Sequence, residues 1–326
     1  MLCPAFCWRG LFWKGSGMRS LVQSVIARIV VCATLAVAPA HAEIVDISDA
    51  PAHPRVSAGA AEAGAEGPRD IVLLGADLVE IAVALDATGR ILARPRVLGL
   101  SGIEDIPHVF RERPGVEGIA AMRPAVVIAS NVRFDQLRDS LEQVGIETAL
   151  IDRTLPATEK VKRLARRLGV EARGARLIAA IEADYAGIRP VSRDGAPLRI
   201  LHASKMGAGG SFSVGGDGTA VQNLIERVGG LNPAAEIGKD RYRSVTPEGV
   251  LMMRPDVVLL SASEVETFGD LDGFWQNYPG IALTPAGRER NIIVMRDMHV
   301  RSDAASSGIA TRALSEALTG MFGAPE

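Results

Sequence analysis

Short apolar runs alternate with amphipathic stretches along most of the chain. Residues 71–74 are Ile-Val-Leu-Leu, a continuous apolar run ended by Gly75, which predicts a buried strand. Residues 77–88 place their apolar side chains at helical spacing and predict a helix. This alternation is typical of a parallel sheet covered by helices on both faces, which places the chain in the α/β class. Further strands are expected at residues 97–100, 126–129, 146–151, 198–203, 257–260 and 292–295, and further helices at residues 134–144, 158–168, 172–188, 219–228 and 304–322.

One segment of the sequence occurs twice. Residues 117–124 are Glu-Gly-Ile-Ala-Ala-Met-Arg-Pro, and residues 248–255 are Glu-Gly-Val-Leu-Met-Met-Arg-Pro. An apolar run follows each copy, so each predicts a short helix, a proline stop and a buried strand. Two copies of one supersecondary unit imply two similar lobes. A cleft between two lobes is a preferred place for a ligand.

The stretch between the lobes has a different pattern. Two helical runs, each heavily charged on one side, meet at Gly169. The second predicts a long helix at residues 171–190 that crosses from an N-terminal lobe (69–170) to a C-terminal lobe (191–326). A helix is stiffer than extended strands, so little hinge motion is expected. The expected fold is two Rossmann-like lobes with mostly parallel sheets joined by a long linking helix.

The first 68 residues lie outside the predicted lobes. Residues 1–42 fit a cleaved signal peptide, with basic residues, an apolar run at residues 29–37 and Ala40-His41-Ala42 as the cleavage motif near Ala42. The apolar run is too short to span a membrane comfortably. Residues 43–68 are rich in Ala, Pro and Gly and predict a flexible tether.

The composition argues against several classes of protein. Cys3, Cys7 and Cys32 all fall in the predicted leader, so the mature chain is expected to hold neither disulfides nor thiolate metal sites. The chain has 36 Lys+Arg, 38 Asp+Glu and no block of basic residues. Nucleic acid is therefore not an expected partner. There is no Gly-x-Ser-x-Gly elbow and no His-Glu-x-x-His spacing, so an enzyme is not expected. The glycine-rich residues 206–218 lack the Gly-Lys-[Ser/Thr] ending of a P-loop and predict a loop beside the cleft.

Five segments match a known family in their order and spacing. They are Gly-Ala-Asp-Leu-Val-Glu-Ile at residues 75–81, Ile106-Pro107, residues 218–232 ending in Gly-Gly-Leu-Asn, Tyr-Arg-Ser-Val-Thr-Pro-Glu at residues 242–248, and Leu-Thr-Pro-Ala-Gly-Arg at residues 283–288. Together they resemble the periplasmic binding proteins of iron–siderophore, haem and cobalamin ABC importers, in particular the haem-binding branch. The resemblance covers about residues 69–322.

The resemblance implies a class III periplasmic binding protein. It implies a periplasmic monomer that holds haem (hemin) between its lobes as a transported ligand and delivers it to a dimeric ABC permease in the inner membrane. It also implies a protein that is not an enzyme and has no catalytic cofactor. In this family one exposed glutamate on each lobe meets arginines of the permease, and Glu117 and Glu248 match those positions. Thr246-Pro247-Glu248 also fits a helix N-terminus, and both roles are compatible.

Haem binders of this family hold the iron with a tyrosinate on a first-lobe loop after the second strand. Residues 100–107 take the place of that loop and contain no tyrosine. His108 follows directly, and a neutral imidazole is a good haem-iron ligand, although a surface histidine is the alternative. The expected ligand-binding residues are thus His108, as the candidate axial ligand, with Tyr242, Met206, Gly75 and Asp77. His299 is a weaker candidate, and Tyr185 and Tyr278 are not favoured.

The missing tyrosine leaves other cargoes open. A ferric siderophore or a corrinoid (cobalamin) would keep the fold, and anionic siderophores need cations. Arginines that can supply them are Arg94, Arg96, Arg111, Arg113, Arg241 and Arg243. A scaffold that no longer binds cargo and a secreted hydrolase are the remaining alternatives.

Overall fold

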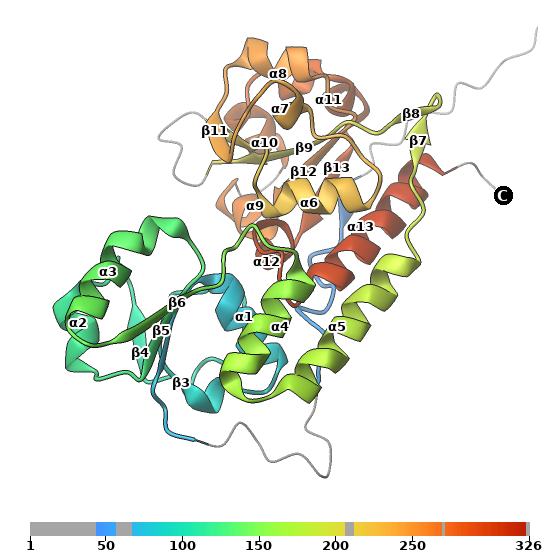
Figure 1. Ribbon diagram of the computed structural model, residues 1–326. Helices are drawn as coiled ribbons and strands as arrows, with labels where there is room; N and C mark the ends of the chain where they lie inside the picture. Colours follow the sequence, from blue (N-terminus) through green and yellow to red (C-terminus); the bar gives the residue numbers. More distant parts are fainter. Residues whose placement is uncertain (1–43, 57–66, 206–211, 269–270, 324–326) are drawn as a thin grey trace, which may run out of the picture. The chain divides into compact units, whose positions relative to one another are not determined.

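Two sheets covered by helices form the framework of the protein (Figure 1). The computed structural model describes residues 44–56, 67–205, 212–268 and 271–323. Each sheet lies between two helical layers, as the alternation of strands and helices predicts, so the α/β class is confirmed. None of the described helices combines the length and apolar character that a membrane-spanning segment requires.

The first sheet is wholly parallel, in the order β4-β3-β2-β5-β6. Its strands are β2 (Ile71–Leu74), β3 (Ile91–Pro95), β4 (His108–Phe110), β5 (Val126–Ala129) and β6 (Glu147–Leu150). One face packs against α1 (Ala76–Ala84), α4 (Ala157–Leu168) and α5 (Glu171–Ala186), and the other against α2 (Val116–Ala121) and α3 (Asp135–Gln143) (Figure 1). Short 3₁₀ turns lie at Thr88–Arg90 and Val132–Phe134. The central strands are buried on both faces, which explains their unbroken apolar runs.

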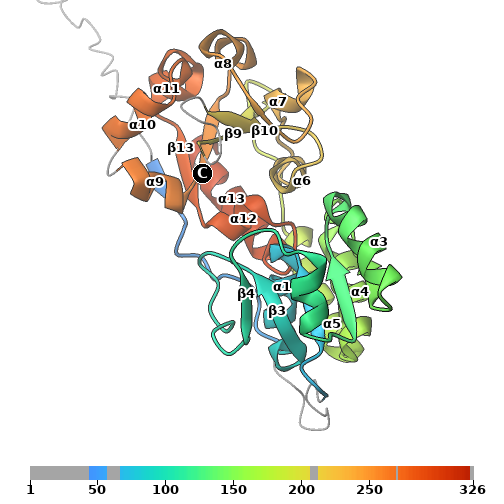
Figure 2. The same ribbon diagram turned by 90° about the vertical axis from the view of Figure 1, so that its left-hand side faces the viewer.

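The second sheet is mostly parallel, in the order β1-β13-β12-β9-β10-β11, and its last two pairs are antiparallel. Its strands are β1 (Ile44–Asp46), β9 (Ile200–Ser204), β10 (Ser213–Gly215), β11 (Tyr242–Ser244), β12 (Val257–Ser261) and β13 (Ile292–Met295). Figure 2 shows α8, α10 and α11 on one side of β13, and α12 and α13 on the other.

The helices of this second lobe also form two layers. One face of the sheet carries α6 (Ala220–Arg227), α12 (Asp297–Arg301) and α13 (Ser307–Phe322). The other carries α7 (Pro233–Glu236), α8 (Pro247–Met253), α9 (Ala262–Phe268), α10 (Leu271–Asn277), α11 (Pro285–Glu289) and the 3₁₀ turn Ile281–Leu283. A small hairpin of β7 (Ser192–Arg193) and β8 (Ala196–Pro197) precedes the sheet.

The long helix expected at residues 171–190 is present as α5, which packs along α13 (Figure 1). The Tyr185 hydroxyl and Ser307 Oγ lie 2.6 Å apart, and Arg312 Nε donates to Asp184 Oδ1 at 2.8 Å. A Cβ on Gly308 would come within 3.0 Å of the α5 backbone, so the two helices approach as closely as a glycine permits. α5 therefore follows the first lobe in the chain and packs against α13, the last helix of the second lobe.

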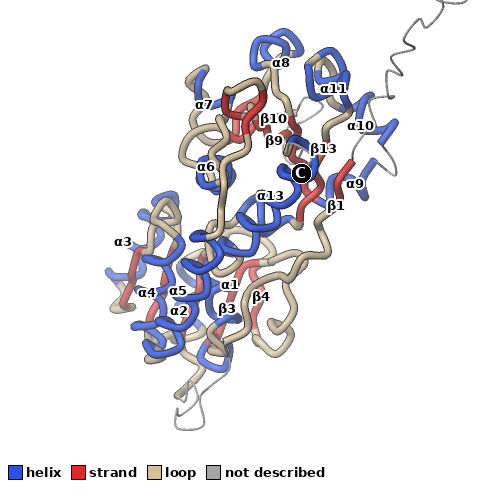
Figure 3. The backbone as a smooth tube through the Cα atoms, turned by 90° about the vertical axis from the view of Figure 1, so that its right-hand side faces the viewer, coloured by secondary structure: helices blue, strands red, loops and turns tan. Residues whose placement is uncertain are grey.

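The N-terminal segment corrects the predicted tether of residues 43–68. Its first described residues form β1, which pairs in parallel with β13 at the edge of the second sheet (Figure 3). Arg296 Nε then donates to the Ala50 carbonyl at 3.1 Å, and Val56 packs into the core of the first lobe. This segment therefore crosses from the second lobe to the first, and its position depends on backbone partners that composition cannot reveal. Residues 57–66 lie outside the described part.

One strand prediction and one loop prediction were also wrong. The second strand is β3 at Ile91–Pro95 rather than residues 97–100, because Gly99 adopts a left-handed backbone (φ 69°) that breaks an extended run. The glycine-rich stretch predicted as a loop contains strand β10, which pairs with both β9 and β11. Strand β3 was missed because Arg94 and Pro95 interrupt its apolar run. Strand β10 was missed because glycines within and beside Ser213–Gly215 interrupt the apolar pattern there.

Candidate functional site

A cavity of about 350 Å³ lies between the two lobes. On the first lobe it is lined by the residues that follow β2, β3, β5 and β6. The strand order changes direction between β2 and β5, so the cavity sits at the topological switch point of the sheet, where α/β proteins place their ligands. On the second lobe its lining comes from the start of α6 and from α12. Apolar lining residues are Leu74, Ala76, Val97, Leu98, Phe134, Ala220 and Met298.

Gly75 lies at the switch point itself and packs against the end of β5. A Cβ at Gly75 would lie 2.1 Å from Ser130 Oγ and 2.6 Å from Asp77 Oδ1. The backbone of this residue is extended, so the need for glycine is steric rather than conformational. Gly75 thus brings the β2–α1 turn into contact with the neighbouring strand and shapes the cavity wall.

Glu80 joins the two lobes beneath the cavity. Its carboxylate is 1% exposed and accepts hydrogen bonds from Ser302 Oγ and from the Ser306 backbone N–H, both at 2.6 Å. Burial raises the pKa of Glu80 to about 7, while these hydrogen bonds and the positive charge of Lys160 act in the opposite direction. Helix α1 is therefore bound to the α12–α13 connection by a carboxyl group that titrates near neutrality.

Asp77 and Lys160 form a second buried polar pair. Lys160 Nζ lies 3.8 Å from Asp77 Oδ2 and donates to the Arg153 carbonyl at 3.1 Å. The lysine is 1% exposed and Asp77 is 8% exposed. Asp77 Oδ2 has no hydrogen-bond partner among the described atoms, so the pair is held by charge at a distance just beyond hydrogen bonding.

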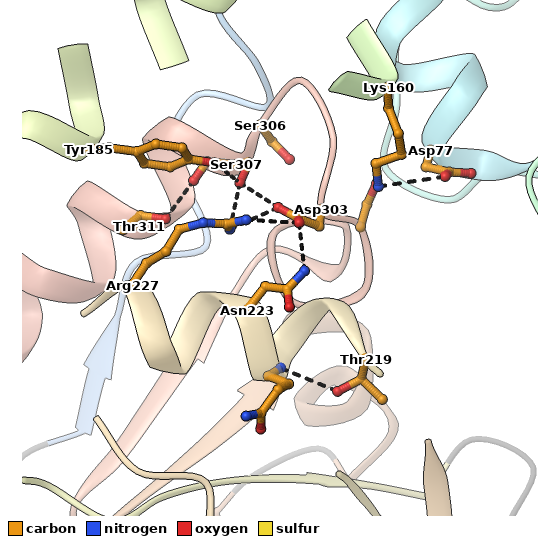
Figure 4. A network of polar contacts seen from close by, with 12 residues as sticks. Asp77, Lys160, Tyr185, Thr219, Asn223, Arg227, Asp303, Ser306, Ser307 and Thr311 are labelled. Atoms are coloured by element: carbon orange, nitrogen blue, oxygen red, sulfur yellow. Dashed lines mark hydrogen bonds and ion pairs between the residues drawn. The ribbon is translucent and has the colours of Figure 1, made fainter. Parts of the chain in front are cut away.

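Asp303 anchors a polar network at the bottom of the cavity (Figure 4). Its Oδ2 accepts from Asn223 Nδ2 and from Arg227 Nη2, each at 2.8 Å, and its Oδ1 accepts from Ser307 Oγ at 2.6 Å. Ser307 in turn contacts the Tyr185 hydroxyl. Burial acts to raise the pKa of Asp303, but the Arg227 hydrogen bond and charge hold it below its usual value. We call Asp77, Glu80, Lys160, Arg227 and Asp303 the floor residues.

The structure places two of the predicted ligand-binding residues, Gly75 and Asp77, in the cavity lining. Tyr242 is partly buried on β11 and lies just outside the residues that line the cavity; its hydroxyl is 3.1 Å from His202 Nδ1. The guanidinium of Arg301, which does line the cavity, lies 5.8 Å from the Tyr242 ring. Burial raises the pKa of Tyr242 to about 12.

The other candidates lie elsewhere. His108 is exposed at the edge of the first sheet and is not among the residues that line the cavity. Met206 lies outside the described residues. His299 Nε2 is 3.1 Å from the Pro51 carbonyl, and burial lowers its pKa to about 4, so it holds the N-terminal segment in place. The Tyr278 hydroxyl is buried and donates to Glu264. No group of three or more His, Cys, Asp or Glu in the described residues is arranged to hold a metal ion.

Glu117 and Glu248 occupy equivalent positions in the two copies of the repeated segment. Each is exposed in the first turn of its helix, α2 or α8. After each helix an arginine with positive φ precedes the repeated proline, Arg123 (50°) after α2 and Arg254 (46°) after α8. Thr246 caps α8, because its Oγ accepts a hydrogen bond from the Gly249 N–H at 3.2 Å. This stretch therefore caps the helix and also leaves the Glu248 carboxylate exposed.

Several charged residues of the site carry a sequence signal that the periodicity analysis did not use. Glu80 falls between Val79 and Ile81, on the buried side of its helix. Lys160 shares the apolar face of α4 with Val161 and Leu164. A charge at an apolar position of an amphipathic helix indicates a buried partner, although it does not say which residue that partner is.

Comparisons with known proteins agree with this architecture. A family model described as periplasmic binding protein matches residues 71–298. The periplasmic heme-binding protein RhuT from Roseiflexus sp. RS-1, in its apo form, is 28% identical, with a TM-score of 0.64, and the match covers 78% of this chain and 100% of that chain.

Two further solved structures share the fold. The heme-binding protein HmuT matches with 21% identity and a TM-score of 0.70, over 84% of this chain and 96% of its own. HutB of Vibrio cholerae, a periplasmic heme-binding protein, matches with 23% identity and a TM-score of 0.63, over 77% and 98%. At these identities the likeness concerns the fold alone. No curated protein matches the sequence.

Proposed function

The chain belongs to the periplasmic binding protein family, and we propose that it captures haem in the cavity between its lobes and delivers it to an ABC permease. The observation that carries the proposal is the cavity itself, where apolar side chains such as Leu74, Leu98 and Phe134 lie beside charged groups at the switch point of the first sheet. A planar, mostly apolar ligand needs such walls. The likeness to the heme-binding protein RhuT, which covers 78% of this chain and 100% of that chain, supports haem as the cargo.

Export belongs to the same proposal. The family is periplasmic, and residues 1–42 have the sequence of a leader that would be cleaved near Ala42. N-terminal sequencing of the protein purified from the periplasm tests the cleavage site, and a mature chain that retains residues 1–42 would contradict it.

Tyr242 and His108 are the two proposed iron ligands. Tyr242 is favoured by its position against Arg301, a cavity-lining residue, whereas His108 is favoured by its exposure on the first lobe. We expect Tyr242→Phe to change the Soret band of the hemin complex and His108→Ala to leave it unchanged. The opposite result would assign the iron to His108, and an unchanged spectrum in both variants would exclude both residues.

Direct titration tests the cargo. We expect added hemin to saturate the purified protein at equimolar amounts, with a shifted Soret band, while cobalamin and ferric siderophores do not compete. Preferential binding of one of those competitors would replace haem with the alternative cargo.

The arginines expected for a siderophore are mostly engaged elsewhere. Arg94 is buried and donates to the Ile103 carbonyl at 3.1 Å, and Arg243 lies 3.7 Å from Asp240. Among the predicted set, Arg96 lines the cavity. The six arginines expected from the sequence therefore do not together surround the cavity, and Arg96 is the member of that set that faces a cargo.

We also propose that Glu117 and Glu248 dock on a dimeric permease. Two separated carboxylates at equivalent positions can each contact one half of a two-fold symmetric partner, which fixes how the protein is aligned on it. Complementary charges then set the docking orientation. Replacing both glutamates by arginine should abolish haem uptake into proteoliposomes that contain the permease, while hemin binding stays unchanged. Glu112→Arg, at another exposed glutamate, serves as the control. Normal uptake by the double variant would refute the docking proposal.

A further inference from the structure

We propose that Arg96, Arg133 and Arg153 form a carboxylate-binding site at the edge of the cavity. The site would select a cargo with an apolar body and carboxylates along one edge, and would fix the orientation in which that cargo enters. This inference rests on the proposed function, because it concerns the same cavity, and it narrows the cargo to a tetrapyrrole whose carboxylates are free. We call these three residues the edge arginines.

The charges deeper in the cavity are already paired. Lys160 and Arg301, which line the cavity, and Arg227, which lies behind Asp303, each have a carboxylate within ion-pair distance and are not left to attract an anionic ligand. The pairs are Lys160 with Asp77 (3.8 Å), Arg227 with Asp303 (2.8 Å) and Arg301 with Glu264 (2.7 Å).

The edge arginines differ in this respect. Arg96, Arg133 and Arg153 line the cavity, are exposed, and form no ion pair with any carboxylate of the described residues. They follow β3, β5 and β6, whose carboxyl ends lie at one edge of the parallel sheet. Like charges that lie close together without a counter-charge raise the free energy of the empty protein, and a bound anion relieves that repulsion.

Arg133 lies close enough to two other arginines for their charges to act on it. Partial burial, and then the positive charges of Arg153 and Arg113, lower the pKa of Arg133 below its usual value. The Arg133 guanidinium lies 4.8 Å from the centre of the Phe134 ring. The Arg113 guanidinium lies 5.4 Å from the centre of the same ring. Phe134 is buried and lines the cavity.

This stacking prepares Arg133 for a planar ligand group. A guanidinium held against an aromatic ring keeps its fork of N–H donors in one orientation, which suits bidentate binding of a carboxylate. Arg113 also donates to the Arg133 carbonyl, so the second guanidinium is positioned as well. Phe134 and Arg133 both line the cavity, so the donors of Arg133 lie beside an apolar part of the wall.

The test compares haem with its dimethyl ester, which keeps the macrocycle and the iron but has no free carboxylates. The double variant Arg133→Gln/Arg153→Gln should bind hemin at least about tenfold more weakly than the wild type and bind the ester with the wild-type affinity. Arg166→Gln/Arg288→Gln removes the same charge from exposed arginines that do not line the cavity, and should leave both affinities unchanged. Hemin affinity of the wild type should also fall with added salt.

Two results would overturn the inference while leaving haem as the cargo. They are hemin binding by the edge double variant as tight as that of the wild type, and an equal loss of hemin and ester, which would mean that the variant damages the apolar cavity. If the wild type binds neither compound, the proposed function and this inference fail together. Tight binding of cobalamin by the wild type would also overturn the inference, because its corrin side chains are amides.

Discussion

The floor and the edge of one cavity use the same types of charged residue in opposite ways. At the floor, Asp77, Glu80, Lys160, Arg227 and Asp303 are largely buried, and each has a partner on a distant part of the chain. At the edge, Arg96, Arg133 and Arg153 are exposed and carry no described counter-charge. Buried charges need partners because water no longer solvates them, whereas exposed charges remain free for a ligand. Substitutions at the floor should therefore change stability, and those at the edge should change affinity.

The largest effect is expected at Asp303. Asp303→Ala leaves Arg227 beside the cavity without its carboxylate, which should cost about 3–5 kcal/mol of the free energy of unfolding. Denaturant-induced unfolding measures this cost. Asn223→Ala removes only a neutral donor to the same carboxylate and should cost about 1 kcal/mol. Equal costs for the two variants would contradict the difference between charged and neutral partners.

Glu80 makes the stability of the floor depend on pH. Its pKa rises from 4.5 in the unfolded chain to about 7 in the folded protein, so the folded state binds more protons in that range. The stabilising contribution is therefore complete below pH 4.5 and is lost as the pH rises through 7. At about 1.4 kcal/mol per pKa unit, the loss amounts to about 3 kcal/mol.

Glu80→Gln should remove this pH dependence, because its amide can still accept from the Ser306 N–H and donate to Ser302. Denaturant-induced unfolding of both proteins, measured from below pH 4.5 to above pH 7, gives their free energies of unfolding. The free energy of unfolding of the wild type, relative to that of the variant, should fall as the pH rises. The shifted pKa of His299 acts in both proteins and cancels. A constant difference between the two proteins would mean that Glu80 does not titrate near neutrality.

Gly75 lies between floor and edge, and Gly75→Ala should cost about 1–3 kcal/mol through overpacking against Ser130. It should also weaken hemin binding, because the cavity wall must shift. Gly118→Ala is the control, since nothing lies within 4 Å of its added Cβ. Combining Gly75→Ala with Ser130→Gly should restore part of the stability, and no recovery would mean that the cost has another source.

The smallest effect on stability is expected at the edge. Arg133→Gln/Arg153→Gln should leave the free energy of unfolding of the ligand-free protein within about 0.5 kcal/mol of the wild type. Denaturant unfolding without ligand measures it. A loss above about 1 kcal/mol would show that these arginines support the fold, and the contrast between floor and edge would disappear.

Local features of the fold were predictable because they depend on residues close together in the chain. The buried runs at β2, β5 and β12, the Thr246 cap and the break between two helices at Gly169 all appear where the pattern places them. Strand β3 was missed because Arg94 faces inward, where its guanidinium donates to the Ile103 carbonyl across a loop. That contact makes a charged residue suitable for a buried strand, and no local pattern contains it.

The site was predictable only at its glycine and its first aspartate. Gly75 and Asp77 were identified through a family motif, and both line the cavity. Glu80 has its partners more than 200 positions away, at Ser302 and Ser306, and the edge arginines follow three different strands. Their convergence depends on the order of strands in the sheet, which the spacing of these residues along the chain does not encode.

The sequence by itself determined the alternation of strands and helices, the doubled segment with its two exposed glutamates, and the caps, because periodicity and capping act over a few residues. The tertiary structure alone decided that β1 joins the second sheet, that Glu80 binds across the lobes, and that three arginines share one edge of the cavity. These outcomes arise from contacts between distant residues, whose energies exist only once the chain path has brought the groups together.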